Sequence, residues 1–386
     1  MNGHKLKNNA PKSTFTCRKR TLDWLINKWL VEHMPHKQSF SKRPGRLKTL
    51  IVSEKDKICQ SQIFPFYFYK SELVDRWNID LKEIRLFDYE SAPEKAPGDA
   101  DVVLLQTWFD IKRPRLDAVI SMIRKHNPNA KLVFLDSFAP TDLRLADWLN
   151  NNVDLYLKKH LLRDRSRYFV PTRGDTNLVD FYGRLYDFPY DEKLYPVPDG
   201  FLEKLIVGPT FSTASYMLPY FASHSEPKKL PDQWDIHGRL AFKGSDWYQT
   251  MRQQAIAAME SMEGYSILSR TGVSRKQYFN ELRSSKMCFS PFGYGEVCWR
   301  DYEAVLCGSL LIKPDMSHME TYPDIFVAHE TYVPVKWDFS DFKEVAEYYL
   351  SHENERKSIA KKAYDVLHEY SRSDRFLEQM APIFAV

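Results

Sequence analysis

Residues 286–315 read KMCFSPFGYGEVCWRDYEAVLCGSLLIKPD: an apolar segment, a glycine-bearing turn, a helical pattern and a second apolar segment. Gly293 and Gly295 allow the backbone of the turn to approach a ligand closely, and the N-terminus of the following helix offers N–H groups to phosphate oxygens. We expect this helix to begin near Glu296 and to end at Gly308, because glycine is favoured just past a helix C-terminus. The pattern predicts a parallel sheet with a ligand site at the carboxyl ends of its strands.

Strand-like and helical segments alternate on both sides of this stretch. Many of the strand-like segments are near-continuous apolar runs, which are typical of strands buried on both faces of a parallel sheet. Strands that alternate with helices imply right-handed βαβ units. The predicted strands are 48–55, 83–90, 101–108, 131–138 and 153–160 in the first half, and 239–245, 265–270, 286–293, 309–315 and a segment near 331–337 in the second. The sequence therefore predicts two successive α/β domains with a cleft between them.

The length of 386 residues also fits two domains rather than one core. We divide the chain into a basic N-terminal leader and helix (1–45), an N-terminal Rossmann-like domain (46–200), a C-terminal Rossmann-like domain (201–370) and a C-terminal helix (371–386) that can pack back on the N-terminal domain. Between the two alternating patterns, residues 171–235 are rich in Pro, Tyr, Phe and Asp, as expected of inter-domain loops.

The composition excludes several classes of protein. A hydrophobic content of 43% with 14% aromatic residues excludes a disordered chain, and no apolar run is long enough to span a bilayer. We expect no secretory signal, because the N-terminus lacks an apolar core. The five cysteines are sparse and lack CxxC spacing, which argues against a disulfide framework or a zinc site. We therefore expect a cytoplasmic protein.

Positive charge is concentrated at the start of the chain. Residues 1–50 contain twelve Lys and Arg and two acidic residues, whereas the net charge of the whole chain is only +4. This basic head, residues 1–50, has two interpretations. It is a surface that binds anionic lipid or a polyanionic acceptor, or it is a solvated leader. Within it, residues 21–34 have an apolar stripe at helical spacing, which can lie on a membrane interface but more often packs on its own protein. The stripe consists of Leu22, Leu25, Ile26, Trp29 and Leu30.

Two charged residues follow the glycine turn on the predicted helix. Arg300 can bind a diphosphate with two parallel hydrogen bonds, and Glu303 can accept hydrogen bonds from ribose or sugar hydroxyls. Taken alone, the two residues would be interpreted as a surface ion pair at i,i+3. Combined with the glycine turn, they favour a site for phosphate and sugar.

The segment 285–315 resembles the donor-binding segment of GT-B glycosyltransferases, particularly the exostosin-like and group 1 types. The matching residues are Arg300, Glu303, Ala304, Gly308 and the strand 310–312. The resemblance implies two Rossmann-like domains facing across a cleft, with a nucleoside diphosphate sugar held by the C-terminal domain. Retaining members often have two glutamates separated by seven residues, whereas Glu296 and Glu303 are separated by six.

Further donor-site candidates flank this segment. Lys243 follows a predicted strand, where members of the family often place a basic residue beside the leaving diphosphate, and Arg270 ends the next strand. A cation at such a position stabilises the charge that develops in the transition state. The loop after residue 313 contributes His318, Glu320 and Thr321, which can contact the donor sugar or base.

An inverting transfer needs a general base from the N-terminal domain. Asp136 and Asp110 follow predicted strands, and His160 follows another after Lys158 and Lys159. A retaining transfer needs no base there. The tripeptide at 99–101, DAD, precedes its strand, whereas a metal site would follow one. We therefore expect no metal, and no cofactor besides the nucleoside diphosphate sugar donor.

These patterns favour a metal-independent glycosyltransferase that moves a monosaccharide to a hydroxyl group of a glycan or glycolipid. Synthesis of a lipopolysaccharide, a capsule or another surface glycan would suit such an enzyme, with peripheral contact to an anionic membrane at its inner face. The alternative is a non-catalytic protein that binds nucleic acid or an anionic membrane through its basic head. A nucleic-acid groove usually spreads over a folded face, whereas here the charge lies in the first 50 residues, so we expect no nucleic-acid partner.

Overall fold

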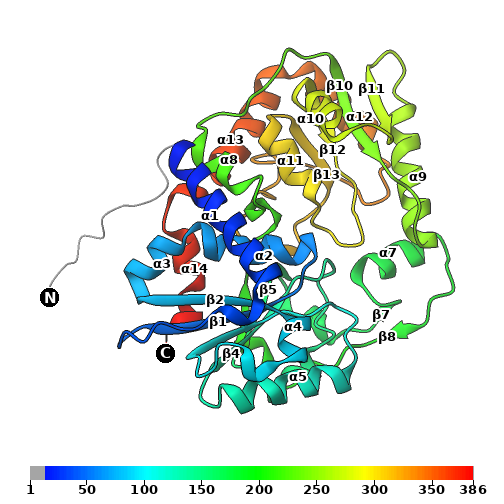
Figure 1. The fold of residues 1–386 in the computed structure, drawn as a ribbon. Helices are drawn as coiled ribbons and strands as arrows, with labels where there is room; N and C mark the ends of the chain where they lie inside the picture. Colours follow the sequence, from blue (N-terminus) through cyan, green and yellow to red (C-terminus); the bar gives the residue numbers. More distant parts are fainter. Residues whose placement is uncertain (1–13, 386) are drawn as a thin grey trace, which may run out of the picture.

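The computed structural model describes residues 14–385, which form two α/β domains placed one above the other in Figure 1. The N-terminal domain contains a six-stranded sheet in which all neighbouring strands are parallel, in the order β2-β1-β3-β4-β5-β9. Its strands are β1 (Leu47–Ser53), β2 (Ile79–Arg85), β3 (Val102–Leu105), β4 (Lys131–Asp136), β5 (Leu155–Lys158) and β9 (Leu205–Val207).

The C-terminal domain contains a five-stranded parallel sheet in the order β11-β10-β12-β13-β15. Its strands are β10 (Trp234–Leu240), β11 (Ile267–Arg270), β12 (Ser285–Phe289), β13 (Leu310–Pro314) and β15 (Val333–Val335). Two short antiparallel pairs complete the strands: β6 (His160–Leu162) with β14 (Met319–Thr321), and β7 (Thr172–Arg173) with β8 (Glu192–Lys193). The predicted fold class, two Rossmann-like α/β domains, is confirmed.

Helices connect most of the strands. The α-helices are α1 (Thr14–His33), α2 (Lys57–Phe68), α3 (Lys70–Trp77), α4 (Leu86–Ser91), α5 (Arg113–His126), α6 (Ala146–Leu149), α7 (Asn177–Leu185), α8 (Leu218–Ser223), α9 (Asp246–Glu260), α10 (Arg275–Arg283), α11 (Trp299–Cys307), α12 (Phe342–Ser351), α13 (Glu353–Arg372) and α14 (Arg375–Phe384). Short 3-10 turns are η1 (Pro35–Lys37), η2 (Pro93–Lys95), η3 (Arg165–Phe169), η4 (Phe201–Lys204) and η5 (Phe211–Thr213).

The first sheet is buried on both faces, as its continuous apolar strands predict. Successive residues of β3 are fully buried and contribute alternately to two separate cores, Val103 and Leu105 to one and Val102 and Leu104 to the other. Helices α4 and α5 cover one face, and α2, α3 and α14 cover the other. This arrangement leaves only the ends of the strands open to a ligand.

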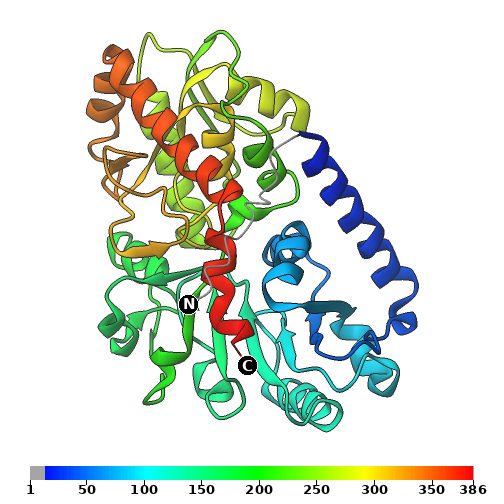
Figure 2. The same ribbon diagram turned by 90° about the vertical axis from the view of Figure 1, so that its left-hand side faces the viewer.

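Besides the inter-domain segment, a strand pair and a returning helix join the two domains. Strand β14 of the C-terminal part pairs with β6 of the N-terminal part, so that Thr321 lies opposite His160. Helix α14 then crosses back to the N-terminal domain, as the red helix in Figure 2 shows. There the rings of Phe376 and Phe384 contact Phe66 in edge-to-face geometry, with centroids 5.4 and 6.4 Å apart.

Several predicted boundaries differ from the structure. The strand expected at 83–90 is wrong: β2 ends at Arg85 and the apolar residues that follow belong to α4. The domain boundary expected at residue 200 falls too early, because β9 still pairs with β5 of the first sheet. Helix α11 begins at Trp299 rather than near Glu296.

The expectation that the apolar stripe of the leader packs on its own protein is also wrong. Helix α1 packs on α2 and α8 through a different set of residues, Cys17, Trp24 and Val31, which recur every seven positions and are buried. Because this set already provides the face that packs on the protein, the stripe at 22–30 is left exposed. The rest of the leader prediction, residues 1–13, lies outside the described residues. In the described part of the chain, no helix has the length and apolar character needed to cross a membrane.

Candidate active site

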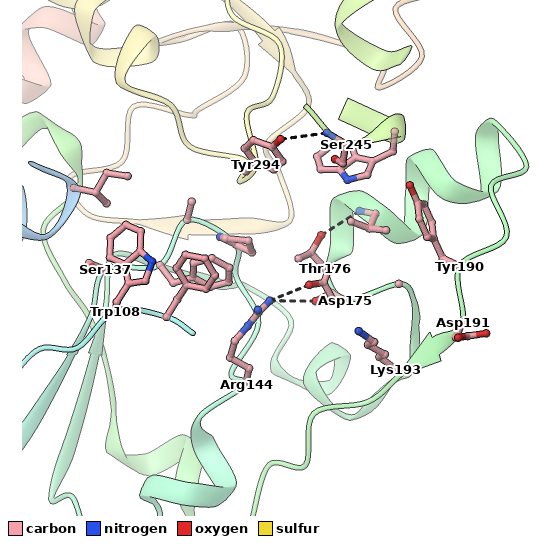
Figure 3. Close-up of a pocket in the computed structure, with 18 of the residues that line it drawn as sticks. Trp108, Ser137, Arg144, Asp175, Thr176, Tyr190, Asp191, Lys193, Ser245 and Tyr294 are labelled. Atoms are coloured by element: carbon pink, nitrogen blue, oxygen red, sulfur yellow. Dashed lines mark hydrogen bonds and ion pairs between the residues drawn. The ribbon is translucent and has the colours of Figure 1, made fainter. Parts of the chain in front are cut away.

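A pocket of about 710 Å³ lies between the two domains (Figure 3). Its lining includes residues from the loops that follow four strands: Trp108 and Phe109 after β3, Phe138 after β4, Ser245 after β10 and Tyr294 after β12. Ligands of open parallel sheets bind outside the carboxyl ends of the strands. The pocket therefore lies where the topology of both sheets predicts a ligand.

Aromatic rings form the N-terminal side of this pocket. Phe109 and Phe138 stack with their centroids 4.4 Å apart and an interplanar angle of 19°, and Trp108 lies beside Phe109 at 5.2 Å. On the C-terminal side the rings of Trp247 and Tyr294 meet edge to face at 6.1 Å. Flat apolar walls of this kind can pack against the C–H faces of a sugar ring.

Polar groups enter the pocket from Arg144 and from the segment before α7. Arg144 binds Asp142 through two hydrogen bonds of 2.7 and 2.9 Å, and its Nη2 lies 3.7 Å from the carboxylate of Asp175 (Figure 3). Its guanidinium also lies over the ring of Phe138, 4.2 Å from the centroid. Burial lowers the pKa of Arg144, but the hydrogen bonds and charge of Asp142 outweigh this effect and raise it, so the group stays positively charged.

On the C-terminal wall, two tyrosine rings cover the loop after β10. Tyr248 and Tyr294 stack at 4.6 Å with an interplanar angle of 4°. Tyr294 Oη accepts a hydrogen bond from the backbone N–H of Ser245. Gly244 is packed against both rings, because an added Cβ would lie 2.4 Å from Tyr294 Oη. Lys243, predicted as a diphosphate contact, lies exposed in this loop.

Two arginines lie behind this tyrosine pair. The guanidinium of Arg252, on α9, lies 5.0 Å from the centroid of Tyr248, and Arg300, on the first turn of α11, donates to the backbone oxygen of Arg239. Their charges interact, because burial and the positive charge of Arg300 lower the pKa of Arg252. Burial also acts to lower the pKa of Arg300, but Tyr278 and two cysteines outweigh it and raise that pKa. Among residues 14–385, neither arginine has a carboxylate partner, and the Nε of each is buried without a hydrogen bond. The protein thus places a buried cation, Arg252, beside a half-buried one, Arg300, with no carboxylate partner for either among residues 14–385.

Glu303 of α11 points to a different set of groups. Its two oxygens accept hydrogen bonds from Tyr216 Oη at 2.9 Å and Tyr278 Oη at 2.8 Å. The ring of Trp299 stacks on Tyr216 at 5.9 Å, on the inter-domain segment before α8. A donor whose hydroxyls bind Glu303 would have to replace one of these tyrosines as the hydrogen-bond partner.

The turn before α11 contacts the N-terminal domain. A Cβ added at Gly295 would lie 2.3 Å from the backbone oxygen of Ala139, so the two loops touch through their backbones. The same oxygen accepts a 2.6 Å hydrogen bond from Nε2 of His160. Glu296 is buried beside this contact and accepts from Asn177 at 3.2 Å.

Glu296 also faces two imidazole rings. Its Oε1 lies 3.7 Å from Nε2 of His318. Within residues 14–385, its Oε2 and the Nδ1 of His160 are buried without hydrogen-bond partners. Burial raises the pKa of Glu296, but its interaction with His318 and, to a smaller extent, with His160 outweighs this and lowers it. The residues predicted at 295, 296, 318 and 160 are therefore brought together at the domain junction, although Glu296 does not line the pocket.

The remaining predicted residues lie elsewhere. Asp136 is buried and its Oδ2 accepts from Lys158 at 2.7 Å and Tyr156 at 2.6 Å, which leaves it poorly placed to receive a substrate proton. Asp110 is exposed in the turn beside Trp108. Arg270 is exposed and pairs with Glu260.

Glu320 and Thr321 belong to β14, the strand that joins the domains. Glu320 pairs with Arg165, and the Thr321 hydroxyl donates to Asp324 at 3.2 Å. Gly293 lies in the turn of the predicted donor segment. A Cβ added there would lie 3.3 Å from Cys298 Sγ. In residues 14–385, no group of His, Cys, Asp and Glu has the arrangement of a metal site.

Comparison with known proteins identifies the type of fold and domain. Residues 228–381 match the model of a glycosyl transferase-like family. A glycosyltransferase from Rickettsia africae has a TM-score of 0.50 at 10% sequence identity, over 88% of this chain and 99% of its own. The chain has the GT-B fold, and its C-terminal part matches a glycosyl transferase-like family.

Other GT-B structures are less similar. An alpha-glucosyltransferase solved with UDP and DNA has a TM-score of 0.49 at 11% identity, over 89% of this chain and 99% of its own. HepE from Anabaena, solved with UDP-glucose, has a TM-score of 0.42 at 11% identity, over 87% of this chain and 99% of its own. No curated protein matches the sequence.

Sequence patterns did not reveal most residues of this GT-B pocket. The aromatic residues, Arg144 and Asp175 come from segments far apart in the chain, and none has a motif. One signal for the pocket was nevertheless present, since the pair Trp108-Phe109 closely follows a buried strand. Arg252, which does not line the pocket, also had a signal, because it lies between Tyr248 and Ile256 at spacings of four on the apolar face of a helix.

Two buried histidines predict that the stability of this protein decreases in acid. Burial and the charge of Lys158 lower the pKa of His160 to about 4, and burial with Arg300 and Arg239 lowers that of His237 to about 3. Both rings are thus neutral in the folded protein at pH values where the unfolded chain binds protons. The stabilisation that comes from the two neutral histidines is fully present above pH 6.5, the ordinary pKa of histidine. It is lost as the pH falls toward the lowered pKa values.

Urea unfolding between pH 7 and pH 5 tests this expectation. Each histidine should contribute a loss of about 1.4 kcal/mol per pH unit below its ordinary pKa. His237→Leu should reduce the slope, because it removes one titrating group. Neither nitrogen of His237 has a hydrogen-bond partner in the described part of the chain, so the substitution breaks no hydrogen bond. The exposed His352→Gln variant is the control and should keep the original slope. Equal slopes for all three proteins would contradict the assignment.

Proposed function

We propose that the protein transfers a monosaccharide from a nucleoside diphosphate sugar to a hydroxyl group of a glycan or glycolipid. The observation that supports this most is the pair formed by the buried Arg252 and the half-buried Arg300, neither of which has a carboxylate partner among the described residues. Burying a charge without a partner is costly, and a bound diphosphate would supply the missing anions. The glycosyl transferase-like match covers both residues.

In this proposal the C-terminal domain binds the donor and the N-terminal domain the acceptor. The arginine pair holds the diphosphate and stabilises the charge that develops on it as the glycosidic bond breaks. These two guanidiniums supply the positive charge that a divalent cation would otherwise provide, so the proposed reaction needs neither a metal nor a cofactor. Glu303 accepts hydrogen bonds from ribose or sugar hydroxyls after releasing Tyr216 or Tyr278.

The acceptor sugar would lie against the rings of Trp108, Phe109 and Phe138. For an inverting transfer, Asp175 is the carboxylate that we propose as the base, because it lines the pocket while Asp136 and His160 are engaged in buried contacts. It would take the proton of the attacking hydroxyl while the nucleoside diphosphate leaves. A role in surface-glycan synthesis in the cytoplasm agrees with five free cysteines, all within the described residues, and the proposal includes no nucleic-acid partner.

A transfer assay tests the proposal. The protein is incubated with UDP-, GDP-, ADP- and CMP-sugars and a panel of oligosaccharide acceptors, and release of the nucleotide is measured with and without acceptor. We expect acceptor-dependent release for at least one donor. Trp108→Ala should raise the acceptor KM about tenfold through loss of ring packing, and Asp175→Asn should lower kcat about 100-fold if the reaction inverts.

Donor affinity provides the control, since neither substitution lies among the groups proposed to hold the donor. It should stay within about twofold of the original value in both variants. If no nucleotide sugar bound and no acceptor increased nucleotide release, the proposed reaction would be wrong. If binding occurred but both variants transferred normally, the acceptor side of the proposal would be wrong.

A further inference from the structure

Helix α1 exposes five large apolar side chains on one face. They recur at helical spacing, at positions i, i+3, i+4, i+7 and i+8, and therefore form one continuous stripe. Their exposed fractions are 56% for Leu22, 49% for Leu25, 52% for Ile26, 49% for Trp29 and 37% for Leu30. We call these five residues the α1 stripe. Single exposed apolar residues are common in proteins, but a continuous row of this length marks an interaction surface.

The other face of α1 holds the helix on the protein. Trp24 is 6% exposed and its ring meets Phe64 edge to face at 4.9 Å. Arg20 binds Glu72 on α3 with an ion pair of 2.7 Å. Figure 2 shows α1, in dark blue, along the outer edge of the molecule beside both domains. The α1 stripe is thus presented outward by a helix that is already fixed, rather than waiting to pack on its own protein.

Positive charges flank the α1 stripe. Arg18 and Lys19 are exposed one turn before its first residue, and Lys37 is exposed in the turn after the helix. Of the two acids on α1, Glu32 lies 3.8 Å from Arg85, which leaves Asp23 as the one exposed carboxylate of the described helix. The complement of this surface is therefore apolar in the middle and anionic at both ends.

A second copy of the chain fits these features poorly. An antiparallel pair of α1 helices would bring Arg18 and Lys19 of one copy toward Lys37 of the other, and like charges would repel. A stable protein interface also needs roughly 20–30 residues on each side, far more than one stripe on one helix. A bilayer surface has neither limitation, because it offers acyl chains and anionic headgroups along the whole helix.

We propose that α1 is a membrane-docking helix that lies in the interface of an anionic lipid surface. The leucine and isoleucine side chains enter the acyl region, the Trp29 ring lies at headgroup level, and the flanking cations contact lipid phosphates. The proposal goes beyond the proposed reaction and does not depend on it. If both hold, the active-site pocket is carried to acceptors that are themselves attached to the membrane.

Vesicle sedimentation with the full chain tests the proposal. The probes are vesicles of phosphatidylcholine alone and of an equal mixture of phosphatidylcholine and phosphatidylglycerol. We expect binding to the mixed vesicles that weakens with added salt, because the headgroup attraction is screened. The triple variant Leu25→Gln, Ile26→Gln and Trp29→Gln should lower the affinity at least about tenfold, because the inserted apolar area is lost.

Phe87→Gln is the matched control, since Phe87 is 76% exposed on α4, away from the α1 stripe, and its loss should leave vesicle binding unchanged. Unchanged thermal unfolding shows that the triple variant remains folded. The proposal is overturned if the original chain does not bind the mixed vesicles, if it binds neutral vesicles equally well, or if the triple variant binds as tightly. It is also overturned if the original chain is a dimer that the triple variant dissociates. Neither nucleotide nor acceptor is present, so the result is independent of the proposed reaction.

Discussion

Replacing either Arg252 or Arg300 with methionine is expected to weaken nucleotide-sugar binding roughly 100-fold while the protein stays about as stable as before or, for Arg252, becomes more stable. Arg252 is buried and Arg300 half-buried, and neither has a carboxylate partner among the described residues. Loss of one charged hydrogen-bonding group to a diphosphate should weaken binding by about 3 kcal/mol, or roughly 100-fold. At Arg252 the folded protein loses an unfavourable buried charge in the same step, and methionine retains most of the side-chain length.

Calorimetric titration with the best donor measures the donor affinity, and thermal unfolding without donor measures the stability. Arg270→Met is the matched control, because Arg270 is an exposed arginine of the same domain that pairs with Glu260. It should bind the donor normally and unfold near the original temperature. The interpretation would be contradicted by normal donor affinity in the variants of Arg252 and Arg300. A large loss of stability in them would instead show that these arginines serve the fold.

Substituting Gly295 with alanine is expected to lower kcat/KM for transfer by about 100-fold while leaving donor affinity nearly unchanged. The added methyl group would lie 2.3 Å from the backbone oxygen of Ala139, which is itself fixed by the hydrogen bond from His160. Since a backbone atom cannot rotate away, the two loops must separate. A displacement of about 1 Å between reacting groups is enough to cost roughly 100-fold in rate.

Donor affinity should survive this change, because Arg252 and Arg300 both belong to the C-terminal domain. Gly98→Ala is the control for the loss of a glycine, since a Cβ there meets its nearest atom at 3.4 Å, an ordinary contact. It should transfer at the original rate. Normal transfer by the Gly295 variant would show that the two domains need not touch at this point during catalysis.

The strands and the fold class were predictable because the cause is local. A run such as Val102–Leu105 is apolar at every position, and the structure buries each of its residues on one face or the other of a parallel sheet. The same signal failed at 83–90, where the apolar residues continue from a strand directly into a short helix. Hydrophobicity alone does not show where the spacing of buried residues changes from the period of two in a strand to the period of 3.6 in a helix.

The candidate site was predictable only in part, because much of it depends on pairs of residues that the fold brings together. Arg300 and Glu303 share one helix and could be found from their spacing beside a glycine turn. Arg252 could be placed on the apolar face of its helix. That it has no carboxylate partner among the described residues could not be predicted, because this depends on the packing of the folded chain. The pocket combines Trp108, Phe138 and Asp175 from three separate segments, and no spacing in the sequence connects them.

The returning helix α14 has a consequence for how this chain is made. One core of the first sheet contains residues from α2 and α3 together with Tyr370, Phe376 and Phe384. During synthesis, those earlier helices leave the ribosome with an apolar face that stays open until some three hundred further residues have been added. The N-terminal domain therefore cannot complete its folding first, in contrast to the usual order of multidomain proteins. Its final assembly must wait for the C-terminal domain, so the two halves mature together rather than in sequence.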